Sequence, residues 1–448
     1  MNRSRSIEDS TEDKQRTRLA GWQAPGGRKF ESPAIAELYE QRARRLADVV
    51  QLRQPDRVPS LMMAAGMVAR YAGISFADTF YDADKSAAAT LKFVEDFRPE
   101  YTMLIGGLAA GKAYDLLGYH AYKWPGSSLP DDMPFQYVEG EYMPAEDYDA
   151  LANNPEGYML RRYLPRVCSH LQGLSLVPNL FTPVEMIGVS MWLAGLTAPP
   201  LQEALSRLSQ AMDHVSKSMA VAMRTSARMV GHHGCPSLVG GITKAPFDIV
   251  ADTLRGTRAA MTDLYRRPEK VLAASEALIP SAIHMGVGSG QSTSPPFVFM
   301  PLHKGAAGFM SIKHFEKFYW PSYQRVLEGI IAAGMVPFSF VEGSFDQARL
   351  DMIAGSGLPA GRTAWLFDRS DLRLVKKCFA GFACVGGNVP VSLFRTGTPA
   401  QMEDHCKRLL DDVAPGGGFF LSSGAPVDEA DPAVVRAFMG CAEKYGVY

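Results

Sequence analysis

The amino-acid sequence predicts an α/β fold built on a parallel sheet. In the second half of the chain, short apolar runs alternate with helical patterns, which is typical of parallel strands joined by crossover helices. The runs are almost continuously apolar, and this indicates a sheet that is covered on both faces. Two arrangements fit, an open doubly wound sheet and a closed (β/α)8 barrel. No GxGxxG sequence opens a helix after the first strand, which disfavours a nucleotide-binding open sheet.

The first half of the chain is predicted to be mainly helical, with apolar residues at helical spacing and proline at helix starts. In chain order we expect a helix over 33–56, a strand over 58–64, helices to about 98, a strand over 101–107 and further helices over 160–233. Residues 120–160 are rich in Pro, Gly, Asp and Tyr and predict an insertion or lid, because long loops are usually functional. Its many aromatic residues could cover an aromatic or apolar substrate, or form a subunit contact.

The second half supplies the remaining strands of the sheet. The apolar runs that predict them span residues 237–242, 297–303, 336–343, 363–368, 382–390 and 418–424. Helical patterns such as SIKHFEKFYWPSYQRVLEGIIAAG separate most of them. The glycine-rich loop at 286–291 does not run into a convincing helix, so a phosphate cradle there is disfavoured.

The overall composition excludes several classes of protein. The chain of 448 residues is 47% hydrophobic and 21% charged, which is ordinary for a globular chain that buries a sizeable core. Its net charge of −1 gives no electrostatic reason to expect binding to nucleic acid or to an anionic membrane. No apolar run reaches the length that a membrane span needs.

Residues 1–30 mix both signs of charge and lack an apolar stretch, which excludes a secretory signal and predicts a flexible arm. A short arm packed on a partner subunit is the alternative. Residues 31–448 are expected to form one domain. The six cysteines are scattered and contain no CxxC, which predicts reduced thiols in a cytoplasmic protein.

Polar residues close several of the predicted strands. His303, Glu342, Asp368 and Asn388 each stand where an apolar run stops. In a parallel barrel the carboxyl ends of the strands share one rim, where active sites lie, so we expect these side chains to converge. A glutamate here could act as a general acid or as an oxygen ligand to a metal. Gly343, which follows Glu342, would let a ligand approach the backbone.

Each of these residues has a plainer alternative. Glu342 could cap the next helix through backbone N–H groups, and Asp368 could orient a base or cap a helix. Asn388 is either a turn former or a neutral hydrogen-bond donor. His303 precedes Lys304 in a cationic loop that could bind an anionic substrate or be an exposed turn. Asp248 follows a strand, and we expect it on the same rim.

Three segments resemble the uroporphyrinogen decarboxylase superfamily. They are FMSIKHFEKFYWPSYQRVLEGIIAAGMVPFSFVEG, CVGGNVPVSLFRTGTPAQMEDHCKRLLDDVAPGGGFFLSSG and AEKYGVY. The resemblance covers about 240–448 and extends more weakly over 55–110. It implies a (β/α)8 TIM barrel, here with an N-terminal helical extension and an insertion near 120–160. It also implies a homodimer, and the superfamily contains both porphyrin decarboxylases and corrinoid-linked methyltransferases.

The chain departs from both branches of that superfamily. The arginine-rich RQAGR motif that binds porphyrin carboxylates is matched by Met63, Ala64, Ala65, Gly66 and Met67, which speaks against a porphyrin substrate. The HxC zinc motif of the thiol methyltransferases is matched by Phe340, Val341 and Glu342, and the later Cys falls near Ala425. A zinc–thiolate site is therefore in doubt. Glu342 with His303 or Asp368 could still ligate a divalent metal.

Two enzyme hypotheses follow, and a non-catalytic binding barrel is a third. The first is methyl transfer from an aryl methyl ether or methylamine to a corrinoid (cobalamin), or to tetrahydrofolate. The chain has no DxHxxG cobalamin motif, so the corrinoid would arrive on a separate protein. The second is a decarboxylase or other lyase for a non-porphyrin acid. There His303, Lys304 or Arg70 would hold the carboxylate, and Glu342 or Asp368 would supply the proton.

Overall fold

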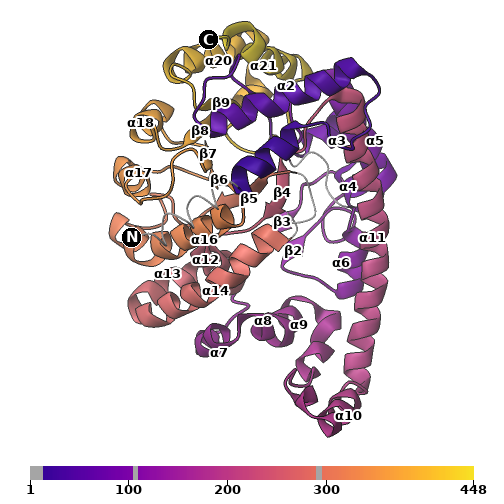
Figure 1. Ribbon diagram of the computed structural model, residues 1–448. Coiled ribbons are helices and arrows are strands. Elements are labelled where there is room, and N and C mark those ends of the chain that lie inside the picture. Colours follow the sequence, from indigo (N-terminus) through magenta and orange to yellow (C-terminus); the bar gives the residue numbers. More distant parts are fainter. Residues whose placement is uncertain (1–13, 104–108, 289–294) are drawn as a thin grey trace.

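The computed structural model describes residues 14–103, 109–288 and 295–448. Its centre is a parallel sheet with strand order β1-β9-β8-β7-β6-β5-β4, curled so that helices pack around its outside (Figure 1). The strands are β1 (Ser60–Leu61), β4 (Val239–Ile242), β5 (Phe297–Leu302), β6 (Val336–Val341), β7 (Ala364–Phe367), β8 (Cys384–Val389) and β9 (Phe419–Ser423). This architecture confirms the predicted α/β fold of the TIM-barrel type.

The sheet is open between β4 and β1, and one more segment lies beside β4. Thr102 pairs with Ser237 in a parallel bridge, and the Leu238 amide donates to the Thr102 carbonyl at 3.2 Å. The strand expected over 101–107 therefore begins where an eighth barrel strand would lie. Residues 104–107 of that prediction, and 289–291 of the glycine-rich loop, lie outside the described residues.

The helices between the strands of the second half cover the outer face of the sheet. They are α14 (Pro268–Gly288), α16 (Trp320–Ala332), α17 (Gln347–Ala354), α18 (Leu372–Cys378) and α20 (Pro399–Val413), followed by α21 (Pro432–Tyr445). Strand alternation divides the core into two clusters. In β6, Phe338 and Phe340 belong to the cluster inside the curled sheet, whereas Val341 belongs to the cluster under the helices.

Among the described helices, α14 alone is long and apolar enough by length and composition to cross a membrane. It packs against α16 and α7 (Tyr148–Asn153), and it buries Val271, Ala274, Leu278 and Ala282 among its residues. Its apolar character is thus that of a helix in the protein core.

The prediction of a flexible arm over 1–30 is wrong for its described part. Residues 14–23 form a helix that buries Leu19 and Trp22. The Gln15 side chain donates to the Met335 carbonyl at 2.8 Å, and the Trp22 indole donates to the Ser237 carbonyl at 3.1 Å. Gln15, Leu19 and Trp22 lie on one helical face. The charged residues between them make the segment polar in composition, and so the prediction was an arm.

The first half contributes α2 (Pro33–Val50), α3 (Met67–Ala72), α4 (Phe76–Tyr81) and α5 (Ala83–Phe97). A large insertion then separates residue 103 from β4, longer than the expected 120–160. It contains α6 (Gly111–Leu117), a hairpin of β2 (Tyr122–Lys123) and β3 (Gln136–Tyr137), α7, α8 (Pro155–Tyr158), α9 (Leu164–Val167), α10 (Met186–Gly195) and α11 (Pro199–His233). In Figure 1 the hairpin lies between β4 and α6.

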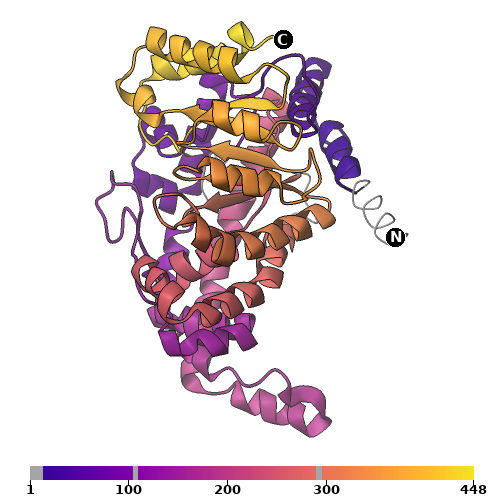
Figure 2. The ribbon, with the colours of Figure 1, turned by 90° about the vertical axis from the view of Figure 1, so that its left-hand side faces the viewer.

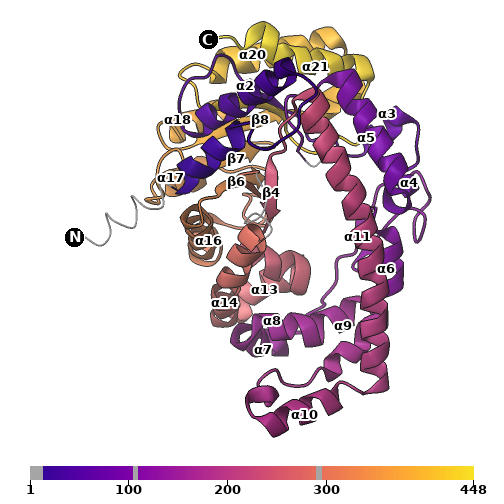
Figure 3. The same cartoon turned by 45° about the vertical axis from the view of Figure 1, so that its right-hand side comes forward.

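The segment around α10 projects from the far end of α11, away from the sheet (Figures 2 and 3). We call residues 176–195 the apolar arm. Its exposed apolar side chains are Leu176, Leu180, Phe181, Val184, Met186, Ile187, Val189, Met191 and Leu193. Within the described parts of the chain, nothing covers this surface.

Candidate functional site

The short helical segment that follows β4 carries two aspartates on one face. It consists of α12 (Pro246–Asp248) and the π-helical turn η5 (Ile249–Leu254). Asp248 and Asp252 are four residues apart, so both side chains can reach the same neighbour. That neighbour is the loop after β5, which begins with His303.

Asp248 is fully buried beneath this loop. It accepts hydrogen bonds from the backbone N–H groups of His303 and Lys304 at 3.1 and 2.9 Å and from the Tyr319 hydroxyl at 2.7 Å. Burial raises the pKa of Asp248, and the nearby Asp252 charge raises it further. Asp248 therefore lies under the rim rather than on it as predicted, and it fixes the position of His303.

His303 lies between two carboxylates. Its Nδ1 is 2.5 Å from Asp252 Oδ2, and its Nε2 is 3.2 Å from Glu342 Oε1. Burial alone would lower the pKa of His303, but the hydrogen bonds to Asp252 and Glu342 outweigh it and raise the pKa to about 10. At neutral pH the ring is therefore an imidazolium that donates to both carboxylates.

Asp252 pairs with three cationic side chains. Besides His303 it contacts Lys244 Nζ at 2.9 Å and Lys304 Nζ at 3.3 Å. Burial would raise the pKa of Asp252, but the His303 hydrogen bond and the Lys244 charge hold it well below its usual range. We call Lys244, Asp252, His303, Lys304 and Glu342 the His303 cluster.

Glu342 is the solvent-facing member of the His303 cluster. Its backbone N–H donates to the Leu302 carbonyl at 3.1 Å, and its side chain is 46% exposed. It does not cap the following helix, because Asp346 caps α17. Gly343 has a φ of +94°, and an added Cβ would lie 3.1 Å from the Ala306 methyl, so glycine suits this turn. The carboxylate is thus presented at the carboxyl end of β6.

Asp368 lies beside the His303 cluster without contacting His303. Its carboxylate accepts from the Gly343 N–H at 3.3 Å and lies 3.4 Å from Arg369 Nε. Burial raises the pKa of Asp368, with a smaller rise from the Glu342 charge. Asp371 caps α18, so Asp368 is not that helix's cap. It supports the turn that holds Glu342.

The other predicted site residues lie at different distances from the His303 cluster. Asn388 donates to the Ser370 carbonyl at 2.8 Å and so ties the end of β8 to the loop after β7. Lys304 belongs to the cluster, although Asp252 already pairs with it. Arg70 is exposed on α3, with its guanidinium 5.0 Å from the centre of the Phe76 ring, and no contact joins it to the His303 cluster.

Sequence reasoning missed Asp252, Lys244 and Tyr319. The signal for Asp252 was present, since the stretch FDIVAD places two aspartates four residues apart after a strand. No pattern in the sequence marks Lys244 or Tyr319. Their roles arise from packing between distant segments.

The His303 cluster has too few ligand atoms to form a complete metal site. His303 Nε2 and Glu342 Oε1 could serve as two ligands, with Asp252 orienting the ring through Nδ1. The nearest further groups of the cluster, Lys244 and Lys304, are cations. Within the described ranges, no group of three His, Cys, Asp or Glu residues is arranged to hold an ion.

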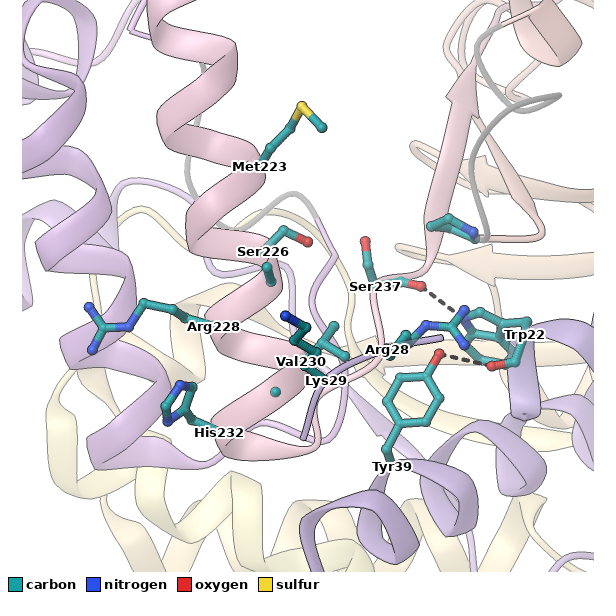
Figure 4. A pocket seen from close by; sticks show the side chains of 13 residues that line it. Trp22, Arg28, Lys29, Tyr39, Met223, Ser226, Arg228, Val230, His232 and Ser237 are labelled. Atoms are coloured by element: carbon teal, nitrogen blue, oxygen red, sulfur yellow. Dashed lines mark hydrogen bonds between the residues drawn. The ribbon is translucent and has the colours of Figure 1, made fainter. Parts of the chain in front are cut away.

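A cavity lies at the end of the sheet opposite to the His303 cluster. Its volume is 590 Å³, and Trp22, Tyr39, Met223 and Ser237 are among its lining residues (Figure 4). Ser237 precedes β4, so this cavity is at the amino ends of the strands, whereas His303 follows the carboxyl end of β5. Sites at the amino ends of barrel strands serve stability rather than catalysis.

Comparison with known proteins agrees with this architecture. The family described as uroporphyrinogen decarboxylase (URO-D) matches residues 143–445, more than half of the chain. No curated protein matches the sequence. A solved structure of a methyltransferase from Methanosarcina mazei is similar with a TM-score of 0.57 and 12% identity, covering 91% of this chain and 98% of that chain. At this identity the likeness shows the fold alone.

Proposed function

The chain belongs to the uroporphyrinogen decarboxylase family, and from this premise we propose that it is an enzyme that transfers a methyl group from a small methylated donor, an aryl methyl ether in the first instance. One observation carries the proposal. At the carboxyl ends of β5 and β6, an imidazolium held by Asp252 donates a hydrogen bond to the exposed Glu342 carboxylate. This is a proton donor placed where barrel enzymes bind substrate.

The acidity of this donor suits a phenolic leaving group. The pKa of His303 is raised to about 10, close to that of a phenol such as a tyrosine side chain. When the methyl–oxygen bond breaks, the electron pair stays on the oxygen, and the His303–Glu342 pair can supply its proton. An imidazolium and a phenolate of similar pKa exchange that proton without a large free-energy cost.

The methyl acceptor comes from outside the chain in this proposal. A corrinoid carried by a separate protein would supply a nucleophilic cobalt, and tetrahydrofolate is the variant acceptor. The 46% exposure of Glu342 supports a docked acceptor, because the pair is reachable from solvent. A homodimer and a cytoplasmic location remain predictions, and sedimentation velocity checks the first of them.

A lyase that acts on a non-porphyrin carboxylic acid is the second candidate. The cations Lys244 and Lys304 on the same rim favour it, although both already pair with Asp252. The two arginine positions of the porphyrin-binding RQAGR motif are occupied by Met63 and Met67. An eight-carboxylate porphyrin would therefore lack its clamp.

The assay that tests the proposal incubates the purified protein with 2-methoxyphenol and reduced cobalamin. Formation of methylcobalamin and catechol in equal amounts is expected. Release of carbon dioxide from a panel of aromatic acids, with no cobalamin present, would instead establish the lyase. Metal analysis of the same preparation should find less than one zinc per chain, because the donor set is incomplete; one tightly held zinc would contradict this.

A further inference from the structure

The insertion forms a cavity walled by aromatic rings. We call it the aromatic cavity. Its volume is 460 Å³, within the range that holds drug-sized ligands. The six rings that line it are Phe80, Tyr114, Tyr119, Tyr122, Trp124 and Phe135, and the three other lining residues are two leucines and a cysteine.

Three tyrosine hydroxyls of this wall are free to bind a ligand. Tyr114, Tyr119 and Tyr122 are half-buried, and their hydroxyls make no hydrogen bond to any residue that the structure describes. The Trp124 indole, in contrast, already donates to the Tyr81 hydroxyl at 3.0 Å. Burial raises the pKa of Tyr119, so its hydroxyl stays protonated and can donate.

None of the residues that line the aromatic cavity is charged. A carboxylate or phosphate would therefore find no cation there, and burying it would be costly. A quaternary ammonium ion is attracted by aromatic rings, but it fills only a small part of 460 Å³. The lining favours a neutral ligand with flat apolar faces and an oxygen that accepts a hydrogen bond.

A second cavity adjoins the aromatic cavity. It has a volume of 240 Å³, and Phe80 and Phe135 line both. Its lining also includes Ala65 and Gly66, two of the positions that match the arginine motif of the porphyrin decarboxylases. Ala65 and Gly66 are the alanine and glycine of that motif, and their small side chains leave room for this hollow beside the aromatic rings.

Ring contacts connect the aromatic cavity to the His303 cluster. The Tyr122 and Tyr137 rings are 5.1 Å apart, and the Tyr137 hydroxyl donates to the Asp252 carbonyl. The Asp252 carboxylate in turn holds His303. A ligand seated against Tyr122 would therefore lie next to the hairpin whose Tyr137 contacts Asp252, the residue that holds the proton donor His303.

We propose that the aromatic cavity binds the ring system of a neutral aromatic compound, and that hydroxyls of Tyr114, Tyr119 and Tyr122 hydrogen-bond an oxygen of that compound other than the methoxy oxygen that His303 and Glu342 protonate. The assignment names the substrate class of the function proposed above and rests on that function for its catalytic meaning. Binding itself is independent of turnover, and this separates the two tests.

Calorimetric titration with 6-methoxy-2-naphthol, which carries a hydroxyl oxygen besides its methoxy oxygen, tests the binding. Wild-type protein should bind it with a Kd on the order of 10 µM, and should bind tetramethylammonium and 2-naphthoate at least tenfold more weakly. Tyr119→Phe keeps the ring but removes one hydroxyl, and it should weaken binding about fivefold. Tyr265→Phe is the matched control, because Tyr265 is 76% exposed and lines none of the cavities described above, so its Kd should not change.

Leu117→Trp fills the cavity and should weaken binding at least thirtyfold. Equal affinity of wild type and Leu117→Trp, or tighter binding of tetramethylammonium than of 6-methoxy-2-naphthol, would overturn the assignment. Methyl transfer without binding in this cavity would contradict the cavity assignment and leave the proposed reaction standing. Tight binding with no methyl transfer would contradict the proposed reaction and leave the cavity assignment standing.

Discussion

Glu342→Gln is expected to lower kcat for methyl transfer by about 10²–10⁴-fold, the usual contribution of a general acid–base group. The amide oxygen can still accept the hydrogen bond that His303 Nε2 donates to Glu342 at 3.2 Å. The fold and the position of the ring should therefore survive, while the exposed carboxylate that moves the proton is lost. Steady-state kinetics with the methyl donor, together with a thermal melt, measure both effects.

Glu316→Gln is the matched control for this variant. Glu316 is an exposed glutamate on the helical segment after β5, and among the described residues no hydrogen bond or ion pair joins it to the His303 cluster. Its kcat should equal that of the wild type. If Glu342→Gln also retained the wild-type rate, Glu342 would have no part in the mechanism, in either the methyltransferase or the lyase reaction.

Asp252→Asn is expected to have the largest effect on the charge of the site. Asp252 accepts from the imidazolium of His303 and pairs with Lys244 and Lys304. Removing its charge leaves Lys244 and Lys304 without this carboxylate in a partly buried place, and leaves Glu342 as the carboxylate beside His303. The free energy of unfolding should fall by about 3 kcal/mol, as when one partner of a buried ion pair is removed.

The contribution of His303 to the free energy of unfolding depends on pH. The folded pKa of His303, about 10, lies above the ordinary value of 6.5. Its stabilising contribution is therefore fully present below pH 6.5 and is lost as the pH rises through about 10. In Asp252→Asn the pKa of His303 should fall, and the loss of stability between pH 6.5 and 10 should become shallower.

Urea unfolding at a series of pH values, and NMR titration of the His303 ring, measure the two quantities. Asp411→Asn is the control, because Asp411 is an exposed aspartate on α20 that enters none of the ion pairs described above. It should leave both profiles unchanged. An unshifted His303 titration in Asp252→Asn would show that Asp252 does not hold the proton on this ring.

Much of the sheet could be predicted from the sequence because its strands are marked locally. The six apolar runs of the second half all form strands, from β4 to β9, and each differs from the predicted bounds by a few residues at most. The convergence of His303 and Glu342 also followed, since the carboxyl ends of adjacent parallel strands share one rim. Whether these residues catalyse a reaction stays a proposal.

The residues that were missed depend on contacts between distant segments. The helix over residues 14–23 was predicted as an arm because its charged residues dominate its composition, yet Leu19 and Trp22 are buried against the sheet. Arg70 was expected at the site, but helix α3 holds it on the surface over Phe76. Local composition carries no information about which surface a segment will meet.

By itself, the sequence determined the alternation of strands and helices and the polar residues that end each strand, because periodicity and strand ends are properties of neighbouring residues. The tertiary structure alone decided that Asp252 keeps the His303 ring protonated and that tyrosines from the insertion gather around an uncharged cavity. Both depend on the distance between groups that lie far apart along the chain. Charge and burial act through space, and only the folded chain sets those distances.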